Sequence, residues 1–198
     1  MTRGAALSFF LAISTALTFE PWAVEEGVAV SIAHSGSATP WIRGAAEIPA
    51  PAEEVFAILC DFGGYAGLFA PTVRKSAVLP DPGPGVRVHL VWRYPFPFRN
   101  RDAVVRYEAE RLPGETFRVS WRDDARESDP AEGVRIRRVE GETTVVPLSS
   151  ERCLVTYTFL GDLGGSFPRA GEEKAWKREP VTYILALRQR LGAPVPAR

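Results

Sequence analysis

The sequence contains few of the residue types that most often perform catalysis or hold metal ions. Among its 198 residues there are two cysteines, Cys60 and Cys153, and two histidines, His34 and His89. Neither pair has the spacing of metal ligands, and neither histidine lies in a recognisable motif with a nucleophilic serine or cysteine. The glycine-rich residues 161–165 lack the lysine and the Ser/Thr of a phosphate-binding loop. We therefore predict no metal site, no cofactor and no catalytic residue, and we interpret both histidines as solvent-exposed.

The two cysteines do not define a disulfide framework. Two cysteines can pair in an exported protein, but the sequence does not show whether their positions approach within bonding range. Cys60 ends an apolar helical stripe, and Cys153 falls within an expected strand. We predict that both are small buried hydrophobic residues, with a disulfide between them as the alternative.

The chain also lacks an excess of charge of either sign. It has 24 basic and 24 acidic residues, and its arginines are scattered along the sequence. This balance argues against a nucleic-acid partner and against a surface that binds anionic lipid. The acidic residues Asp123, Asp124, Glu127 and Asp129 do not match the spacing of a calcium loop. We predict a solvated charged loop over residues 122–132.

Long uncharged runs are absent except at the N-terminus. Arg3 is followed by an uncharged stretch over residues 4–19, and residues 14–16 offer small side chains for cleavage after Ala16. The stretch is shorter than the roughly 20 apolar residues that span a membrane. We predict a signal peptide over residues 1–16 and a periplasmic or secreted protein, with an uncleaved N-terminal anchor as the alternative.

Alternation and turn residues predict a series of strands after this segment. Side chains alternate between the two faces of a strand, and prolines and glycines separate the alternating stretches. A helix over residues 51–60 and a short second helix ending near residue 70 interrupt the series. The predicted strands cover residues 27–33, 41–48, 73–79, 86–94, 101–112, 116–123, 134–146 and 153–160, with a bulge near residues 137–139.

The last segment has helical periodicity. From residue 169 onward, apolar residues recur every three or four positions, and Gly192 and Pro194 end the pattern. Pro180 should kink this helix or shift its start. Strands joined by short turns form an antiparallel sheet, whose apolar face one long helix can cover. We predict an α+β fold: a curved antiparallel sheet wrapped around a long C-terminal helix, with two short helices after the first strands.

Arg101 occupies an unusual place in this pattern. In the strand over residues 101–112 it shares a face with Val105 and Tyr107, so its guanidinium points toward the apolar interior. A buried guanidinium needs a partner, water or a ligand. We therefore predict a cavity rather than a solid core next to Arg101.

This order of elements and four stretches of sequence resemble the START-domain family (steroidogenic acute regulatory protein-related lipid transfer). That family belongs to the helix-grip superfamily, together with polyketide cyclases and aromatases. The resemblance spans residues 22–192, which we take as one ligand-binding domain followed by a tail over residues 193–198. The four stretches are residues 47–56, 61–65, 95–102 and 157–165.

The resemblance implies an apolar tunnel between the sheet and the C-terminal helix. In sterol-binding relatives, the arginine that matches Arg101 pairs with an acid on the preceding strand, but residues 86–94 contain no acid. Arg101 is therefore expected to face a ligand carboxylate, phosphate or bound water. The alternative is a structural ion pair with Asp102, Asp123 or Asp162.

Aromatic residues supply the other candidates for ligand contact. The sequence has 11 Phe, 5 Tyr and 5 Trp, and such side chains fill cores as well as line apolar pockets. We expect the protein to bind, and in one reading to transfer, a lipid or other hydrophobic small molecule. A cavity enzyme of polyketide cyclase or hydrolase type is the alternative, and oligomeric state and transient membrane contact stay open. The predicted ligand-binding residues besides Arg101 are Trp92, Tyr94, Tyr107, Trp121, Tyr157, Phe159, Trp176 and Tyr183.

Overall fold

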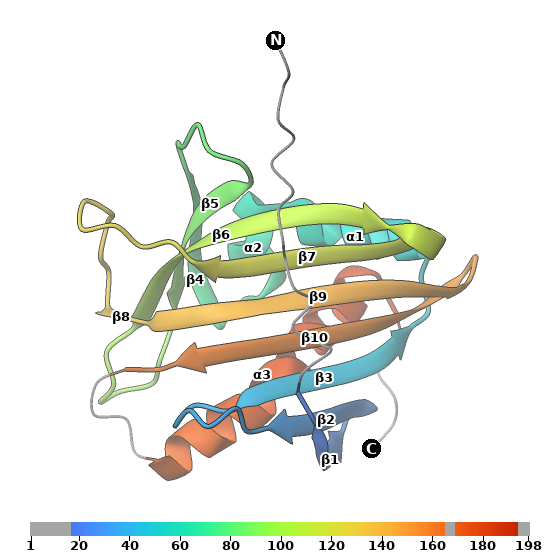
Figure 1. The fold of residues 1–198 in the computed structure, drawn as a ribbon, viewed down its shortest axis with the longest axis horizontal. Coiled ribbons are helices and arrows are strands. Elements are labelled where there is room, and N and C mark those ends of the chain that lie inside the picture. Colours follow the sequence, from blue (N-terminus) through green and yellow to red (C-terminus); the bar gives the residue numbers. More distant parts are fainter. Residues whose placement is uncertain (1–16, 165–168, 194–198) are drawn as a thin grey trace.

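One curved sheet of ten strands wraps around a long C-terminal helix in the computed structural model (Figure 1). The structure describes residues 17–164 and 169–193, so the predicted signal peptide over residues 1–16 lies outside the described residues. The strands are β1 (Glu20–Glu25), β2 (Val28–Ala33), β3 (Trp41–Ile48), β4 (Val73–Leu79), β5 (Val86–Trp92), β6 (Arg101–Leu112), β7 (Thr116–Asp123), β8 (Val134–Arg135), β9 (Arg137–Ser149) and β10 (Arg152–Asp162).

Antiparallel hairpins build most of the sheet, in the order β1-β2-β3-β10-β9-β7-β6-β5-β4. The pairing of β3 with β10 joins the first strands to the last one, with Ile48 opposite Cys153. The short strand β8 is the exception, because it pairs with the start of β6 in parallel. The sheet therefore continues from one edge to the other although its strands come from two separate parts of the chain.

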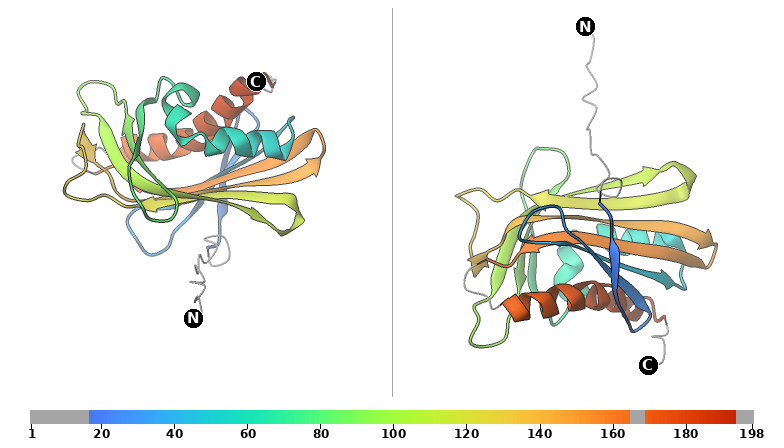
Figure 2. Two further views of the ribbon diagram at one scale, coloured as in Figure 1. Left: turned by 90° about the horizontal axis from the view of Figure 1, so that it is seen from above. Right: turned by 60° about the horizontal axis from the view of Figure 1, so that its bottom comes forward.

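The helices all lie on one face of this sheet, as the view from above shows (Figure 2). α1 (Ala52–Cys60) packs on β7 and β9, and α2 (Tyr65–Leu68) packs on β4. The long helix α3 (Arg169–Arg190) packs mainly on β3 and β2. Short 3₁₀ turns cover η2 (Phe62–Gly64) and η3 (Pro113–Glu115). The α+β helix-grip fold predicted from the sequence is thus confirmed.

A close contact between Gly44 on β3 and Pro180 places α3 on the sheet. A Cβ atom on Gly44 would lie 2.4 Å from the Pro180 Cβ, a distance that no side chain tolerates. The helix continues through Pro180, and its residues Val181, Ile184 and Leu187 are fully buried. The absence of a side chain at Gly44 therefore lets α3 approach this half of the sheet.

Two details differ from the sequence prediction. β1 was not predicted, because Glu20, Pro21 and Glu25 leave no clear apolar alternation in this edge strand. The strand predicted over residues 134–146 is two strands, β8 and β9. Its irregularity falls near the predicted bulge, where Arg138 has a φ of 59°.

The cysteines do not form a disulfide: Cys153 is buried, Cys60 is half-buried and both are free. They lie within the apolar core, Cys60 at the end of α1 and Cys153 at the start of β10. The prediction that both are small buried hydrophobic residues is confirmed for Cys153, whereas Cys60 is half-buried and packs against the core.

Candidate functional site

A pocket lies between the inner face of the sheet and α3. It has a cavity volume of about 120 Å³ and is lined by residues from α2, from α3 and from β4, β5, β6, β7, β9 and β10. A single water needs roughly 10–15 Å³ by this kind of measure, so the cavity has room for several waters or a small organic group. β2 and β3 contribute no lining residue, because α3 packs directly on them.

Eight of the nine predicted ligand-binding residues line this pocket. Their rings contact one another: the centroids of Tyr157 and Tyr183 are 3.9 Å apart, and those of Trp121 and Tyr157 are 5.5 Å apart. Stacked rings of this kind combine large buried area with a fixed shape. The eight residues are Trp92, Tyr94, Tyr107, Trp121, Tyr157, Phe159, Trp176 and Tyr183.

Several polar atoms of these aromatic residues already have protein partners. The Tyr183 hydroxyl lies 2.9 Å from the Thr143 hydroxyl, and the Trp176 indole donates to the Gly161 carbonyl at 3.4 Å. Nearby, the Tyr65 hydroxyl donates to the Leu59 carbonyl at 2.6 Å. Such bonds orient the rings, so the shape of the pocket is fixed by its supporting polar contacts.

Arg101 is the ninth candidate, and it does not line the pocket. Its guanidinium is 3% exposed and donates hydrogen bonds to the carbonyls of Leu163 (3.1 Å), Arg99 (2.6 Å) and Gly164 (3.3 Å). It also lies 5.1 Å from the centre of the Tyr94 ring. These contacts tie the start of β6 to the chain after β10, and contact of Arg101 with a ligand stays a prediction.

Glu179 lines the pocket although the sequence analysis did not select it. It follows Trp176 by three residues and precedes Tyr183 by four, so all three side chains share one face of α3. An acidic residue within an apolar helical stripe was the signal that could have identified it. Among the described residues that line the pocket, Glu179 is therefore the one with a carboxyl group.

The surroundings of Glu179 change its ionisation. Burial among apolar groups raises the pKa of its carboxyl to about 7, and a hydrogen bond with the Tyr157 hydroxyl opposes that rise. Burial also raises the pKa values of Tyr157 and Tyr183 above their usual range. The phenols stay neutral at neutral pH, so the Tyr157 hydroxyl donates to an ionised Glu179.

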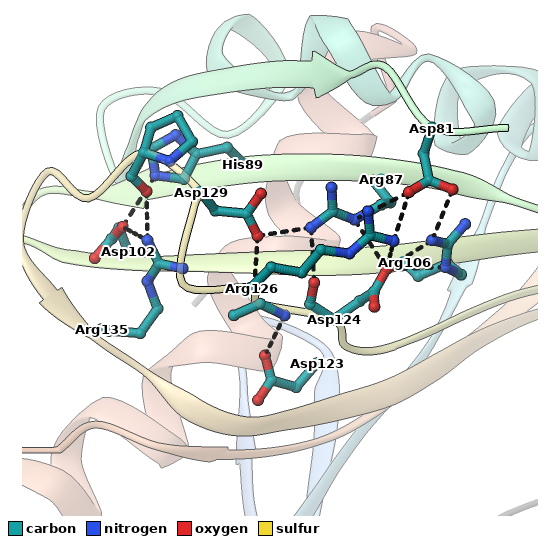
Figure 3. Close-up of polar contacts among 12 residues, drawn as sticks. Asp81, Arg87, His89, Asp102, Arg106, Asp123, Asp124, Arg126, Asp129 and Arg135 are labelled. Atoms are coloured by element: carbon teal, nitrogen blue, oxygen red, sulfur yellow. Dashed lines mark hydrogen bonds and ion pairs between the residues drawn. The ribbon is translucent and has the colours of Figure 1, made fainter. Parts of the chain in front are cut away.

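A second polar cluster lies on the outer face of the sheet, over β5 and β6 (Figure 3). His89 was predicted to be solvent-exposed, and this was wrong: it is fully buried, with its Nε2 3.0 Å from Asp102 Oδ2. The same carboxyl accepts from Arg135 Nη2 at 2.8 Å. A carboxylate only accepts hydrogen bonds, so the His89 Nε2 carries a proton. His89 alternates with inward-facing residues on β5, and the loop that covers this face was not visible in the sequence pattern.

Further along the outer face, arginines and aspartates form an ion-pair network (Figure 3). Arg87 bonds Asp124 at 2.9 Å and Asp129 at 2.6 Å. Arg106 bonds Asp124 at 2.7 Å and Asp81 at 3.2 Å. Both arginines are buried, and charged groups in such a setting need partners.

The prediction of a solvated loop over residues 122–132 is therefore wrong in part. Asp123 and Glu127 are exposed as expected, whereas Asp124 and Asp129 take part in the network. The network and Asp102 together hold residues 124–135 against the sheet. This segment leads directly to Ile136, which is buried and lines the pocket, so the outer cluster supports the inner site.

Two other kinds of site were sought among the described residues. Within residues 17–164 and 169–193, no group of three or more His, Cys, Asp or Glu side chains is placed to hold a metal ion. In the same part of the chain, no helix is long and apolar enough to cross a membrane.

A curved sheet that grips a C-terminal helix over an aromatic pocket defines a protein of the helix-grip class. Residues 40–191 match the sequence profile of the family described as polyketide cyclase/dehydrase and lipid transport. The match covers more than half of the chain, so the protein belongs to this family. A comparison with curated protein sequences gives no significant match.

Solved structures agree with this assignment. A STAR-related lipid transfer protein from Xanthomonas axonopodis is 26% identical, with a TM-score of 0.77 over 88% of this chain and 98% of that one. Human StAR-related lipid transfer protein 5 is 15% identical, with a TM-score of 0.72 over 86% and 85%. An aromatase/cyclase from a Streptomyces species is 17% identical, with a TM-score of 0.59 over 80% and 97%. The last two share the fold.

Replacing Asp102 should destabilise the protein strongly. Asp102→Ala leaves buried His89 and Arg135 without their common acceptor, which should lower the unfolding free energy by about 3 kcal/mol. Urea denaturation at neutral pH measures this change. Asp123→Ala, at an exposed carboxyl on the end of β7, is the control and should change stability by less than about 0.5 kcal/mol. Equal effects of the two substitutions would contradict the supporting role of the cluster.

Glu179 should make the stability of the protein depend on pH near neutrality. Its carboxyl has a higher pKa in the folded state than the usual value of 4.5, so the fold favours the protonated form. The stabilisation is complete below about pH 4.5 and is lost as the pH rises through 7, by at most about 3 kcal/mol. Urea denaturation of wild type and Glu179→Gln from pH 5 to 8.5 measures it. As the pH rises, we expect the unfolding free energy of the wild type to fall relative to that of the variant. A difference between the two proteins that stays constant over this pH range would refute the raised pKa of Glu179.

Proposed function

We propose that the protein binds one lipid or other hydrophobic small molecule in the pocket between the sheet and α3. The observation that carries this proposal is the pocket itself, which aromatic and aliphatic side chains from several strands and α3 surround. Burial of apolar ligand surface contributes roughly 25 cal/mol per Å² before the cost of association. An apolar guest would therefore replace water that makes few hydrogen bonds there.

The comparisons support this proposal at the level of the family. The description of the matching family includes lipid transport, and two of the similar structures are named as lipid transfer proteins. We further propose that the protein carries the bound molecule from one membrane to another.

Access to the pocket requires movement, because the cavity of about 120 Å³ is small for a lipid. The turn between β4 and β5 is held by Arg106, which donates to the Pro84 carbonyl at 2.6 Å. We propose that α3 and the glycines Gly63 and Gly64 move instead. Ligand binding would then enlarge the cavity on the side of α2 and α3.

Export and membrane contact remain part of the proposal. The sequence pattern of residues 1–16, an arginine followed by an uncharged stretch that ends in small residues, supports a periplasmic or secreted location. Phe96 is 97% exposed in the turn between β5 and β6, the turn that also supplies Tyr94 to the pocket. We propose Phe96 as the side chain that touches a membrane during transient contact.

Binding of a neutral fluorescent probe tests the pocket. N-phenyl-1-naphthylamine should brighten on addition of wild-type protein and should be displaced by lipids extracted from the producing cells. Ala175→Phe places a ring in the pocket and should weaken probe binding by about tenfold or more, because one buried ring removes over 1.4 kcal/mol of contact. Ala57→Phe, at an exposed position on α1, is the matched control and should bind as wild type does. Native mass spectrometry of purified protein should reveal a co-purified apolar molecule.

The absence of any bound or displaceable molecule would refute the binding function. Equal probe binding by Ala175→Phe and wild type would show that the probe occupies another surface. Either result would refute the proposal that the ligand binds in this pocket.

A cavity enzyme of polyketide cyclase or hydrolase type is the second candidate. Glu179 favours it, because a carboxyl with a pKa of about 7 beside Tyr157 is suited to accept and return a proton. Such a group could remove a proton from the carbon next to a ligand carbonyl. Hydrogen–deuterium exchange of the methyl protons of 2-acetylnaphthalene, followed by NMR, tests this. Wild type should accelerate exchange about 100-fold over Glu179→Gln, and equal rates would refute the enzyme.

A further inference from the structure

The charge inside the pocket is of one sign. Among the described residues that line it, Glu179 has the only carboxyl group, and none has a guanidinium, an ammonium or an imidazole group. The remaining lining is aromatic and aliphatic, with hydroxyls from tyrosines and threonines. A ligand group that enters this pocket therefore meets a hydrogen-bond acceptor and the electron-rich faces of aromatic rings, both of which attract positive charge.

The Arg101 guanidinium contacts a ring of the pocket but does not itself line it. Arg101 donates to the carbonyls of Leu163, Arg99 and Gly164, and the Tyr94 ring that it contacts lines the pocket. An anionic head group in the pocket would lie beside Glu179 without a cation among the lining residues. Burial of two acidic groups together is unfavourable unless one of them takes up a proton.

We propose that the pocket selects apolar molecules whose polar group is an amine or a hydroxyl, that it rejects molecules with an anionic head, and that Glu179 is the residue that sets this preference. The proposal rests on the proposed binding function and specifies the ligand class. An ammonium group would pair with the Glu179 carboxylate, and a hydroxyl group would donate to it in place of the Tyr157 hydroxyl.

The other groups around Glu179 leave it as the titrating group near neutral pH. Tyr157 on β10, Tyr183 on α3, Tyr107 on β6 and Tyr94 before β6 all have pKa values raised by burial, so they stay uncharged from pH 5.5 to 8.5. On the side of α3 that meets the first strands, Lys177 pairs with Glu25, and Arg178 pairs with Glu25 and Glu26. Arg188 is buried there and donates to the carbonyls of Glu26 and Glu47. Affinity for an ammonium ligand should thus follow the ionisation of Glu179.

A matched set of probes with the same chain tests the preference: decylamine, decanol and decanoic acid. Each displaces N-phenyl-1-naphthylamine from wild type, Glu179→Gln and Glu173→Gln at pH 8.5. In wild type, decylamine should bind at least about tenfold more tightly than decanoate, because a hydrogen bond between two ionised groups is stronger than one between neutral groups. Glu179→Gln should reduce this ratio to less than about threefold. Glu173→Gln, at an exposed acid on the same helix, should keep the wild-type ratio.

The pH dependence of wild type gives a second measurement that needs no variant. Decylamine affinity should fall by about tenfold from pH 8.5 to pH 5.5 as Glu179 takes up its proton, while decanol affinity changes little. Decanoate binding as tightly as decylamine in wild type would overturn the inference, and so would a ratio unchanged in Glu179→Gln. Equal binding of all three probes overturns the preference while leaving the binding function intact. Failure of all three probes to bind overturns both.

Discussion

The fold depends on how α3 rests on the sheet. One helix covers the inner face of a wide curved sheet, and its close contact runs along β3 and β2, where Gly44 admits Pro180. Besides β3 and β2, α3 contacts β10, while α1 packs on β7 and β9 and α2 packs on β4. Aromatic rings from β5, β6, β7 and β10 fill much of the space between these helices. The pocket is the volume that these side chains leave open. The position of the pocket thus follows from the packing of α3 on β2 and β3.

The two polar clusters have opposite physical roles. On the outer face, Arg87, Arg106, Asp102 and their partners neutralise one another and hold the segment before Ile136 in place. On the inner face, Glu179 has a hydrogen bond from Tyr157 but no cation among the pocket residues that are described. A satisfied network fixes structure, whereas a single half-buried carboxyl retains the capacity to bind a donor or exchange a proton.

Much of the fold was predictable because it depends on local patterns. Alternation gave the strands from residue 41 onward, and the period of three to four gave α3. Trp121, Tyr157 and the other candidates on strands line the pocket because they alternate inward, whereas Trp176 and Tyr183 line it from one face of α3. β1 was missed because an edge strand with charged residues lacks that alternation. His89 was misjudged because the loop that covers it comes from a distant part of the chain. Asp124 was misjudged because its partners, Arg87 and Arg106, lie on β5 and β6.

The sequence by itself determined the class of fold, the direction of each strand face and the aromatic character of the interior, since these follow from periodicity within single elements. Only the tertiary structure decided the ionic partners. Arg101 was expected at the ligand, yet two of its described bonds go to the carbonyls of Leu163 and Gly164, about 60 positions along the chain. Glu179 was overlooked on α3 and is the acid that lines the pocket. Charge pairing depends on distances of a few ångströms between remote segments, and linear spacing does not contain them.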